Sequence, residues 1–323
     1  MRLLVVIVNY RTADLTIDCL RSVRAELAAL PETKVVVTDN ASGDNSPARI
    51  ASAITSNGWS KWADHLPLPS NGGFACGNNA AIRSALQSAD PPDYVLLLNP
   101  DTLVRPGAIR QLLDFMESHP HVGIVGSRLE DPDGTPQRSA FRFPTPLSEL
   151  EDGARVGFLT RLLKRRVVAP PAPAIACPVD WVAGASMMIR KAVFESIGLL
   201  EETYFMYYEE VDFCLRANRA GWPCWYVPDS RVVHLVGQSS GITDAIQSRK
   251  RRPAYWFASR RRYFLTHFGP ARTLLADILW AAGFAQWRLR RWITRSPEVD
   301  ADRLLTDFVQ HSLQAGDWDV ATK

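Results

Sequence analysis

The sequence of 323 residues predicts an α/β fold in which helices flank a mainly parallel sheet, followed by an amphipathic helical extension. Two observations lead to this prediction. Continuous apolar runs alternate with stretches of helical periodicity, as is typical of strands buried on both faces of a parallel sheet. After about residue 245, aromatic residues are instead interleaved with arginines.

The first strand, helix and second strand are predicted at residues 3–8, 15–30 and 34–38. Short links join them, so we expect a right-handed βαβ unit with parallel strands. In open α/β sheets, ligands bind beyond the carboxyl ends of the strands. The candidate ligand contacts at those ends are Asn9, Tyr10, Arg11 and Asp39.

Asp39 has two possible roles. It could accept hydrogen bonds from a base or a ribose, or it could close the Asp-Asn-Ala-Ser-Gly turn in which it stands. Position alone leaves both interpretations open. No GxGxxG follows the first strand, so the dinucleotide-binding fingerprint is absent.

A glycine-rich stretch occupies residues 71–79, between a predicted strand at 65–68 and a predicted helix at 80–86. Glycines ahead of a helix N-terminus let backbone N–H groups approach an anion. The same stretch can equally be a plain turn. The candidate binding residues in it are Asn71, Gly73, Phe74 and Asn78.

The clearest buried strand, at residues 94–98, ends in an Asn-Pro-Asp sequence that contains Asn99 and Asp101. A carboxylate there can anchor Mg²⁺ or Mn²⁺, with substrate phosphates supplying further ligands. The alternative is that Asp101 caps the helix predicted at 106–118. His234, at the end of a later strand, is a second candidate metal ligand, although a lone histidine is more often structural.

The middle of the chain is predicted to be less regular. Residues 136–178 are rich in proline and arginine, and we expect either a loop there that shapes an acceptor site or a partly disordered segment. A short basic helix is possible at 162–166. Further short strands are predicted at residues 122–125, 225–228 and 231–234, and a short helix at 194–197.

Three carboxylates, those of Glu209, Glu210 and Asp212, fall at the start of a predicted helix, directly after the aromatic run 204–208. A carboxylate held against aromatic surface has its charged form disfavoured. Its pKa therefore rises, and it becomes a proton acceptor near neutral pH. The alternative is that the acids only stabilise the helix dipole and that Asp212 pairs with Arg216.

The basic charge of the chain is concentrated near its C-terminal end. Residues 249–295 hold 12 Lys and Arg against one acid, so the rest of the chain carries a net negative charge. Aromatic residues among these arginines are typical of helices that lie in a membrane interface. Nucleic-acid binding uses the same residue types, but these aromatics stand on amphipathic helices, so we expect no nucleic-acid partner.

The five cysteines form no CxxC pair or zinc-type spacing, which indicates reduced thiols in the cytoplasm. The apolar run at residues 3–8 is too short for a signal peptide. No stretch approaches the roughly 20 apolar residues that a spanning helix needs. We therefore expect a cytoplasmic protein that is peripheral on the inner face of the cytoplasmic membrane.

Several motifs occur in an order that is more specific than any of them alone. They are Val8-Asn9-Tyr10-Arg11, Val37-Thr38-Asp39-Asn40-Ala41-Ser42, Asn71-Gly72-Gly73-Phe74, Asn99-Pro100-Asp101, Trp181-Val182-Ala183-Gly184-Ala185, Glu209-Glu210-Val211-Asp212 and His234. In this order the chain resembles the family-2 inverting glycosyltransferases, whose fold is the Rossmann-like GT-A fold. It is most similar to rhamnosyltransferase-like members that build bacterial cell-envelope glycans.

The resemblance implies a site for a nucleoside-diphosphate sugar. Residues 9–11 and Asp39 would hold the nucleoside, and residues 71–79 would close on it. Asp101 matches the last residue of the family's D-x-D metal motif, whereas Asn99 replaces its first aspartate, which removes one carboxylate from the metal site. Asn99 could still bind the ribose of the nucleotide sugar or a metal-coordinated water. His234 would be a second metal ligand or a diphosphate contact.

The resemblance also implies the reacting side of the site. Glu210 matches the general base, with Glu in place of the commoner Asp. Gly184, Ala185 and the neighbouring Trp181 would line the donor sugar and the acceptor entrance. The favoured donor is dTDP-rhamnose, and the acceptor would be a hydroxyl of a glycan or a polyprenyl-linked glycan.

These expectations define two domains. Residues 1–245 would form the GT-A domain, with a nucleotide-binding half at about 1–125 and an acceptor half at about 126–245. Residues 246–323 would form a helical extension that binds an anionic membrane surface. A sugar-nucleotide nucleotidyltransferase and a non-catalytic membrane-surface module remain the alternatives; the former needs a glycine-rich loop after the first strand, which is absent.

Overall fold

The computed structural model describes residues 3–235, 250–297 and 299–313. The chain forms two compact units. The first, called here the sheet unit, comprises Met1–Phe141, Pro171–Glu202 and Glu209–Gly241; the second, the helical unit, comprises Arg142–Pro170, Thr203–Tyr208 and Ile242–Lys323. The domain boundary expected at residue 245 lies outside the described residues. Two stretches that precede it belong to the helical unit.

The described residues of the sheet unit form a nine-stranded sheet in the order β3-β2-β1-β4-β10-β6-β11-β5, with β8 beside β11. Its strands are β1 Leu3–Asn9, β2 Thr33–Asp39, β3 Ala63–Pro67, β4 Tyr94–Leu98, β5 Thr102–Val104, β6 Ile124–Glu130, β8 Cys177–Val179, β10 Ser186–Arg190 and β11 Cys224–His234. β3, β2, β1 and β4 run parallel, and β10, β5 and β8 are antiparallel to their neighbours. The predicted mixed, mainly parallel sheet is therefore confirmed.

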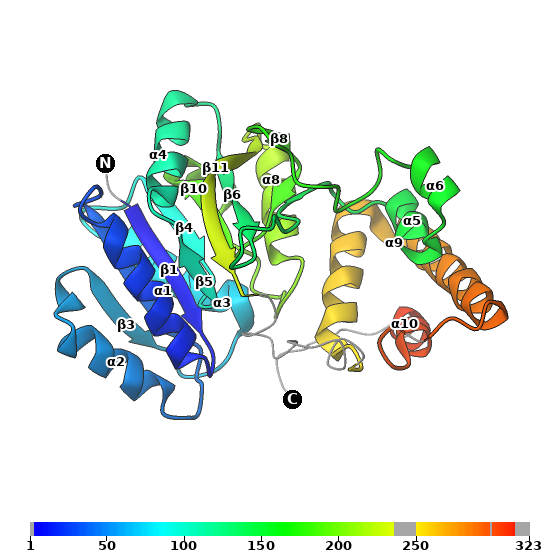
Figure 1. The fold of residues 1–323 in the computed structure, drawn as a ribbon, viewed down its shortest axis with the longest axis horizontal. Coiled ribbons are helices and arrows are strands. Elements are labelled where there is room, and N and C mark those ends of the chain that lie inside the picture. The colour runs from blue at the N-terminus through cyan, green and yellow to red at the C-terminus, as the bar shows by residue number, and fades with distance from the viewer. Residues whose placement is uncertain (1–2, 236–249, 298, 314–323) are drawn as a thin grey trace. The chain divides into compact units, whose positions relative to one another are not determined.

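Helices cover both faces of this sheet (Figure 1). They are α1 Ala13–Glu26, α2 Ser46–Ser56, α3 Gly73–Leu86, α4 Ala108–Ser118, α7 Lys191–Ile197 and α8 Glu209–Arg219, with a short 3-10 helix at Trp59–Lys61. Alternate β1 residues, including Val5 and Ile7, share one core with α1, α2 and α4. On the other face, α3 lies so close to β1 that a β-carbon on Gly77 would stand 2.7 Å from Cγ1 of Val8.

Several elements differ from their predictions. The helix predicted at 15–30 begins at Ala13 and ends at Glu26, and neither α2 nor β5 was predicted. The helix predicted at 80–86 begins at Gly73, so most of the expected loop is helical. The two strands predicted at 225–228 and 231–234 are one strand, β11, whose pairing with β6 shifts register between Val227 and Arg231.

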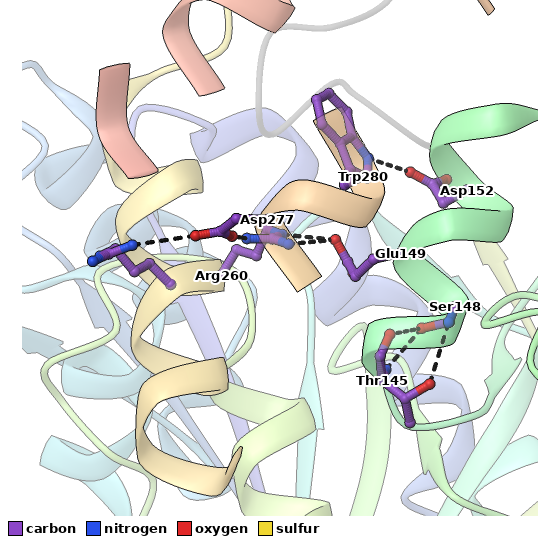
Figure 2. A network of polar contacts seen from close by, with 8 residues as sticks. Thr145, Ser148, Glu149, Asp152, Arg260, Asp277 and Trp280 are labelled. Carbon is purple, nitrogen blue, oxygen red and sulfur yellow. Dashed lines mark hydrogen bonds and ion pairs between the residues drawn. The ribbon is translucent and has the colours of Figure 1, made fainter. Parts of the chain in front are cut away.

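The helical unit contains α5 Pro146–Ala154, α6 Gly157–Leu162, α9 Ala254–Ile293 and α10 Leu304–Leu313. The prediction that 136–178 is irregular is therefore wrong for α5 and α6. α5 starts with a capping box, in which Thr145 and Ser148 bond to each other's backbone N–H (Figure 2). The basic residues expected on a helix at 162–166 follow α6 instead, which ends at Leu162.

α9 is bent into two arms (Figure 1). Gly269 has φ 76° and ψ 171°, which only glycine adopts readily, and Pro270 follows it. Most of the aromatic residues expected to enter a membrane instead form the core of this unit, since Phe257, Trp280 and Phe284 are at most 4% exposed. That part of the prediction is wrong, because the arms of α9 fold against α5 and α10. Among the described residues, no helix is long and apolar enough to cross a bilayer.

A buried ion network holds α5 against both arms of α9 (Figure 2). The Arg260 guanidinium donates to Glu149 Oε2 over 2.8 and 2.6 Å and to Asp277 Oδ1 over 2.6 Å. The three side chains are between 3% and 9% exposed. Trp280 Nε1 also donates to Asp152 Oδ2 over 2.9 Å. Burial raises the pKa of Glu149, and the Arg260 charge opposes that shift.

The segment Thr203–Tyr208 packs on the first arm of α9. Ser259 Oγ donates to the Met206 carbonyl over 2.9 Å, and the ring of Tyr208 lies 5.4 Å from that of Tyr263. Tyr207 and Tyr208 have φ of 69° and 71°, a left-handed conformation that costs non-glycine residues roughly 1–3 kcal/mol each. Contacts with α9 therefore hold a strained backbone directly before Glu209 in the sequence.

Candidate active site

The carboxyl ends of β1 and β2 lie side by side, with Asn9 opposite Asp39. Asn9 Nδ2 donates to Asp39 Oδ2 over 2.6 Å, and Ser42 donates to Asp39 through its hydroxyl over 2.7 Å and its backbone N–H over 3.0 Å. The turn interpretation of Asp39 is thus observed. Ser42 was not predicted as a site residue, although it is the last residue of the motif at residues 37–42.

Tyr10 and Arg11 form the exposed rim above this turn. Arg11 Nε donates to the Ser42 carbonyl over 2.7 Å, and its guanidinium carbon lies 5.1 Å from the Tyr10 ring centroid. Arg11 has φ 58°, so its backbone is held in an uncommon conformation. A cation and an aromatic ring are therefore presented together beside the ends of β1 and β2.

The N-terminus of α3 is tied to the same turn. Asn71 Oδ1 accepts from the backbone N–H of Gly73 over 3.0 Å, and Asn40 Nδ2 donates to the Gly73 carbonyl over 2.9 Å. Asn78 Nδ2 donates one turn back to the Phe74 carbonyl over 2.9 Å. The Oδ1 atoms of Asn40 and Asn78 are buried and have no hydrogen-bond partner within the described part of the chain.

Buried acceptors of this kind are uncommon in folded proteins, which makes them candidates for bonds from a ligand donor. Asn40 was missed in the sequence, although it directly follows Asp39. Asn78 was expected on a loop and lies inside α3, where Gly72 and Gly73 let the helix start early.

Gly184 brings Phe74 and Glu210 together. A β-carbon on Gly184 would lie 3.2 Å from Cε1 and 3.3 Å from Cζ of Phe74, and 3.9 Å from Cβ of Glu210. These contacts join the start of α3, the segment before β10 and the start of α8. A side chain at residue 184 would fill the space between the phenyl ring and the carboxylate stem.

The next residue, Ala185, connects this cluster to the turn after β4, because its carbonyl accepts from the Asn99 backbone N–H over 3.0 Å. Asp101 follows Asn99 by two residues, and its Oδ1 atom lies 3.6 Å from Nε2 of His234. β5 and β11 bring these two residues together, since Thr102 pairs with His234. Burial lowers the pKa of His234, and the Asp101 charge opposes that shift.

The chemistry of Asp101 and His234 fits a divalent cation with a shared coordination shell. Within the described ranges, no group of three or more His, Cys, Asp and Glu could hold a metal ion. One carboxylate oxygen and one neutral imidazole nitrogen can bind Mn²⁺ or Mg²⁺ when donor phosphates and water complete the shell. Asn99 adds no carboxylate to this pair.

The three acids at the start of α8 have different environments. Glu209 is 4% exposed, and burial followed by the Glu210 charge raises its pKa well above its usual value. Burial raises the pKa of the half-buried Glu210 to about 7. Neither Oε2 atom has a hydrogen-bond partner among the residues described. Asp212 instead accepts from Arg216 Nε over 2.7 Å, as the structural alternative predicted.

Trp181 forms an aromatic surface with a residue that the sequence did not indicate. Its ring stacks on Phe141 with centroids 4.1 Å apart and an interplanar angle of 14°. The two residues belong to a separate two-stranded sheet of β7 Ala140–Phe141 and β9 Trp181–Val182. Phe141 was missed because its segment was expected to be irregular.

The predicted residues therefore belong to one connected set within the sheet unit. Contacts run from the Asp39 turn through Asn40 to Gly73, and from Phe74 through Gly184 to Glu210. A second branch runs from Ala185 through Asn99 to the Asp101–His234 pair. The arrangement brings together a carboxylate–imidazole pair, buried polar groups with acceptor atoms left unused by the described residues, and a carboxyl whose pKa is raised to about 7 by burial.

Two family models match the chain over more than half of its length. Glycosyl transferase family 2 matches residues 4–172, and Glycosyl transferase family group 2 matches residues 94–297.

Among curated proteins, the chain is 30% identical to an N-acetylglucosaminyl-diphospho-decaprenol L-rhamnosyltransferase of Mycobacterium tuberculosis, over 67% of the chain and 70% of that protein. It is 28% identical to the rhamnosyltransferase WbbL of Escherichia coli K12, over 51% of the chain and 61% of WbbL.

Solved structures share the fold. A mannosyltransferase from Pyrobaculum calidifontis, in complex with GDP-Man and Mn²⁺, has a TM-score of 0.54 at 15% identity, over 97% of the chain and 81% of that structure. TarS residues 1–349 from S. aureus, in complex with UDP, give a TM-score of 0.52 at 17% identity, over the same shares. These likenesses confirm the predicted GT-A fold. The family models and the mycobacterial relative show that this chain belongs to glycosyl transferase family 2.

Proposed function

We propose that this glycosyltransferase moves a sugar, with inversion, from a nucleoside-diphosphate sugar to a hydroxyl of a lipid-linked glycan acceptor. The observation that carries the proposal is the position of Glu210 beside Gly184 and Phe74, where burial raises the pKa of its carboxyl to about 7. A general base works best when its pKa lies near the working pH.

In the proposed reaction, the ionised Glu210 takes the proton of the acceptor hydroxyl. That oxygen forms a bond to the anomeric carbon as the bond from this carbon to the diphosphate oxygen breaks on the opposite face. The nucleoside diphosphate leaves with the electron pair of the broken bond. One displacement inverts the anomeric centre without a covalent intermediate, so a second catalytic carboxylate is not needed.

The donor would lie along the ends of β1, β2 and β4. Asn40 and Asn78 offer buried acceptors for donor groups of a base or ribose, and Arg11 offers positive charge beside the Tyr10 ring. Asp101 and His234 would hold a divalent cation, which when bound offsets negative charge on the diphosphate. The Phe141–Trp181 stack would present an apolar face to the acceptor sugar.

We propose dTDP-rhamnose as the donor, because the M. tuberculosis and E. coli relatives carry rhamnosyltransferase names, as does a dTDP-rhamnosyl transferase of Shigella flexneri. The Shigella relative is 36% identical over 20% of the chain. The name of the mycobacterial relative describes a decaprenyl-linked acceptor, which supports a polyprenyl-linked glycan here. Such an acceptor would put the reaction at the inner face of the cytoplasmic membrane.

A panel of nucleotide sugars tests this proposal. We expect the purified chain with Mn²⁺ to hydrolyse or transfer from dTDP-rhamnose faster than from UDP- or GDP-sugars, measured as release of the nucleoside diphosphate. We expect EDTA to remove this turnover and added Mn²⁺ to restore it. Release of pyrophosphate from a nucleoside triphosphate and a sugar phosphate would contradict the proposal and favour a nucleotidyltransferase.

The pH dependence follows from the raised pKa of Glu210. The base acts only when it is ionised, so kcat/KM should fall about tenfold per unit as the pH drops below about 7. Because Glu209 lies beside it, this midpoint belongs to the pair. The free energy of unfolding should change in the opposite direction to the activity. The folded state favours the protonated Glu210, so this group's contribution to stability is lost as the pH rises from 4.5 to about 7. A flat profile of kcat/KM through this range would contradict the assignment.

A further inference from the structure

The second arm of α9 exposes apolar side chains on one side along most of its length. Six large apolar side chains on this side are between 48% and 78% exposed. They are called here the apolar stripe: Leu274, Leu275, Ile278, Leu289, Trp292 and Ile293. At about 100° per residue, all six lie within about 60° of the direction of Ile278. Residues 282 and 285, which fill the gap between Ile278 and Leu289, are alanines.

The opposite side of the same arm is buried in the helical unit. Trp280 is 3% exposed and Phe284 is fully buried, and both belong to its core. Gly283 lets this side approach α5, since a β-carbon there would stand 2.8 Å from the backbone nitrogen of Ala154. The arm therefore has one apolar side against protein and a second apolar side that faces outward, which a surface helix in water does not need.

The charges beside the apolar stripe are of one sign. Residues 271–297 contain five arginines and a single acid, Asp277, which is buried and paired with Arg260. A hollow of about 740 Å³ at the end of the arm is lined by three of these arginines together with Trp292, Ile293 and Ser296. The exposed apolar side is thus bordered by cations at the end where Trp292 lies.

We propose that the apolar stripe lies in the interface of a lipid bilayer that carries anionic headgroups. An interfacial helix places its apolar side at the boundary of headgroups and acyl chains, with cations on its borders. From residue 271 to residue 293 the arm is about 33 Å long at 1.5 Å per residue, so it would contact several headgroups. Trp292, at 78% exposed, suits the headgroup level, where tryptophan is enriched.

A second copy of this chain is a poorer occupant. Two copies meeting through the apolar stripe would bring the arginines of both arms close together, and the single acid of residues 271–297, Asp277, is buried. Like charges brought together oppose association. An anionic bilayer instead supplies the opposite charge over the whole length of the arm. This inference does not depend on the proposed sugar transfer, because membrane binding is measured without turnover.

The test is co-sedimentation of the full chain with vesicles of phosphatidylglycerol and phosphatidylcholine, or of phosphatidylcholine alone. We expect binding to the anionic vesicles, weakened by salt. The double variant Ile278→Glu/Leu289→Glu should lower the partition coefficient at least tenfold. Arg272→Gln/Arg295→Gln should also weaken binding, since each arginine near an anionic surface contributes about fivefold at low salt.

Ile175→Glu is the control, because Ile175 is 73% exposed in the sheet unit and the change also replaces an exposed apolar residue with one glutamate. It should bind vesicles as the unchanged chain does. Lipids with brominated acyl chains give a second readout: they should quench tryptophan fluorescence, and Trp292→Phe should remove part of that quenching. This substitution is conservative and exposed, so its result does not depend on how the double variant folds.

Three results would overturn the proposal. The double variant could bind vesicles as well as the Ile175→Glu control does. Brominated lipids could quench the Trp292→Phe variant as strongly as the unchanged chain. The chain could fail to bind vesicles, while the double variant abolishes self-association in analytical ultracentrifugation or lowers the thermal stability as a buried charge would. In that last case, protein rather than lipid covers the apolar stripe.

Discussion

Replacing Glu210 with Gln is expected to lower kcat by about 10²–10⁴-fold, the usual contribution of a positioned base. The amide keeps the shape of the side chain beside Gly184 and Phe74, but it cannot take a proton. Binding of the donor should survive, because the groups proposed to hold it lie at the ends of β1, β2 and β4. The measurements are single-turnover transfer and titration with dTDP in the presence of Mn²⁺.

A matched control is Glu195→Gln, which makes the same change in an exposed carboxylate on α7 that pairs only loosely with Lys191. Its transfer rate should stay within about twofold of the unchanged enzyme, as expected for a surface position. Unchanged turnover in Glu210→Gln would remove that residue from the role of base. If Glu209→Gln loses transfer activity and Glu210→Gln does not, Glu209 is the base.

Replacing Arg260 with Met is expected to destabilise the helical unit by about 3–5 kcal/mol. The change removes the cation that Glu149 and Asp277 share, and Asp277 keeps Arg261, whose Nη1 lies 3.3 Å from its Oδ2. Burial already raises the pKa of Glu149 with the arginine present. Urea unfolding, followed by circular dichroism and tryptophan fluorescence, measures the loss.

Two comparisons make this result specific. Arg110→Met breaks a pair with Asp114 in which both side chains are almost half exposed, and it should cost at most about 1 kcal/mol. Adding Glu149→Gln and Asp277→Asn to Arg260→Met should recover part of the lost stability, because two buried charges disappear. If Arg260→Met costs no more than Arg110→Met, the buried network contributes little to stability.

The sheet could be predicted from the sequence because its central strands are buried on both faces. The runs at 3–8 and 94–98 are continuous apolar segments that became β1 and β4, and three valines between Lys34 and Thr38 became the middle of β2. β5 could not be predicted in this way. It has three residues, and it exists because it pairs with β11, which comes more than a hundred residues later.

The candidate site was predictable where a side chain stands at, or within three residues of, the carboxyl end of a predicted strand. Asn9, Asp39 and Asp101 stand at such ends, and topology alone brings Asn9 and Asp39 together. The contact of Gly184 with Phe74 and Glu210 depends on the packing of three separate elements. Periodicity carries no information about such packing, so the motif order was needed to associate these residues before the structure was known.

The aromatic residues near the C-terminal end show a different limit. Composition alone could not separate Phe257 and Phe264, which are buried in the helical unit, from Trp292, which is exposed. Both kinds stand among arginines in the sequence. The Gly269-Pro270 pair marks the bend of α9 in the sequence, but it does not show which side of each arm is covered.

The helical unit is assembled from three separated stretches of the chain, which has a consequence for protein engineering. A chimera that exchanges everything after residue 245 with a relative would combine the α9 and α10 of one parent with the α5 and Thr203–Tyr208 of the other. The Arg260 position of one parent would then meet the Glu149 position of another. A single crossover therefore separates the two partners of each buried ion pair between α5 and α9, so a stable chimera needs both sides of the pair from one parent.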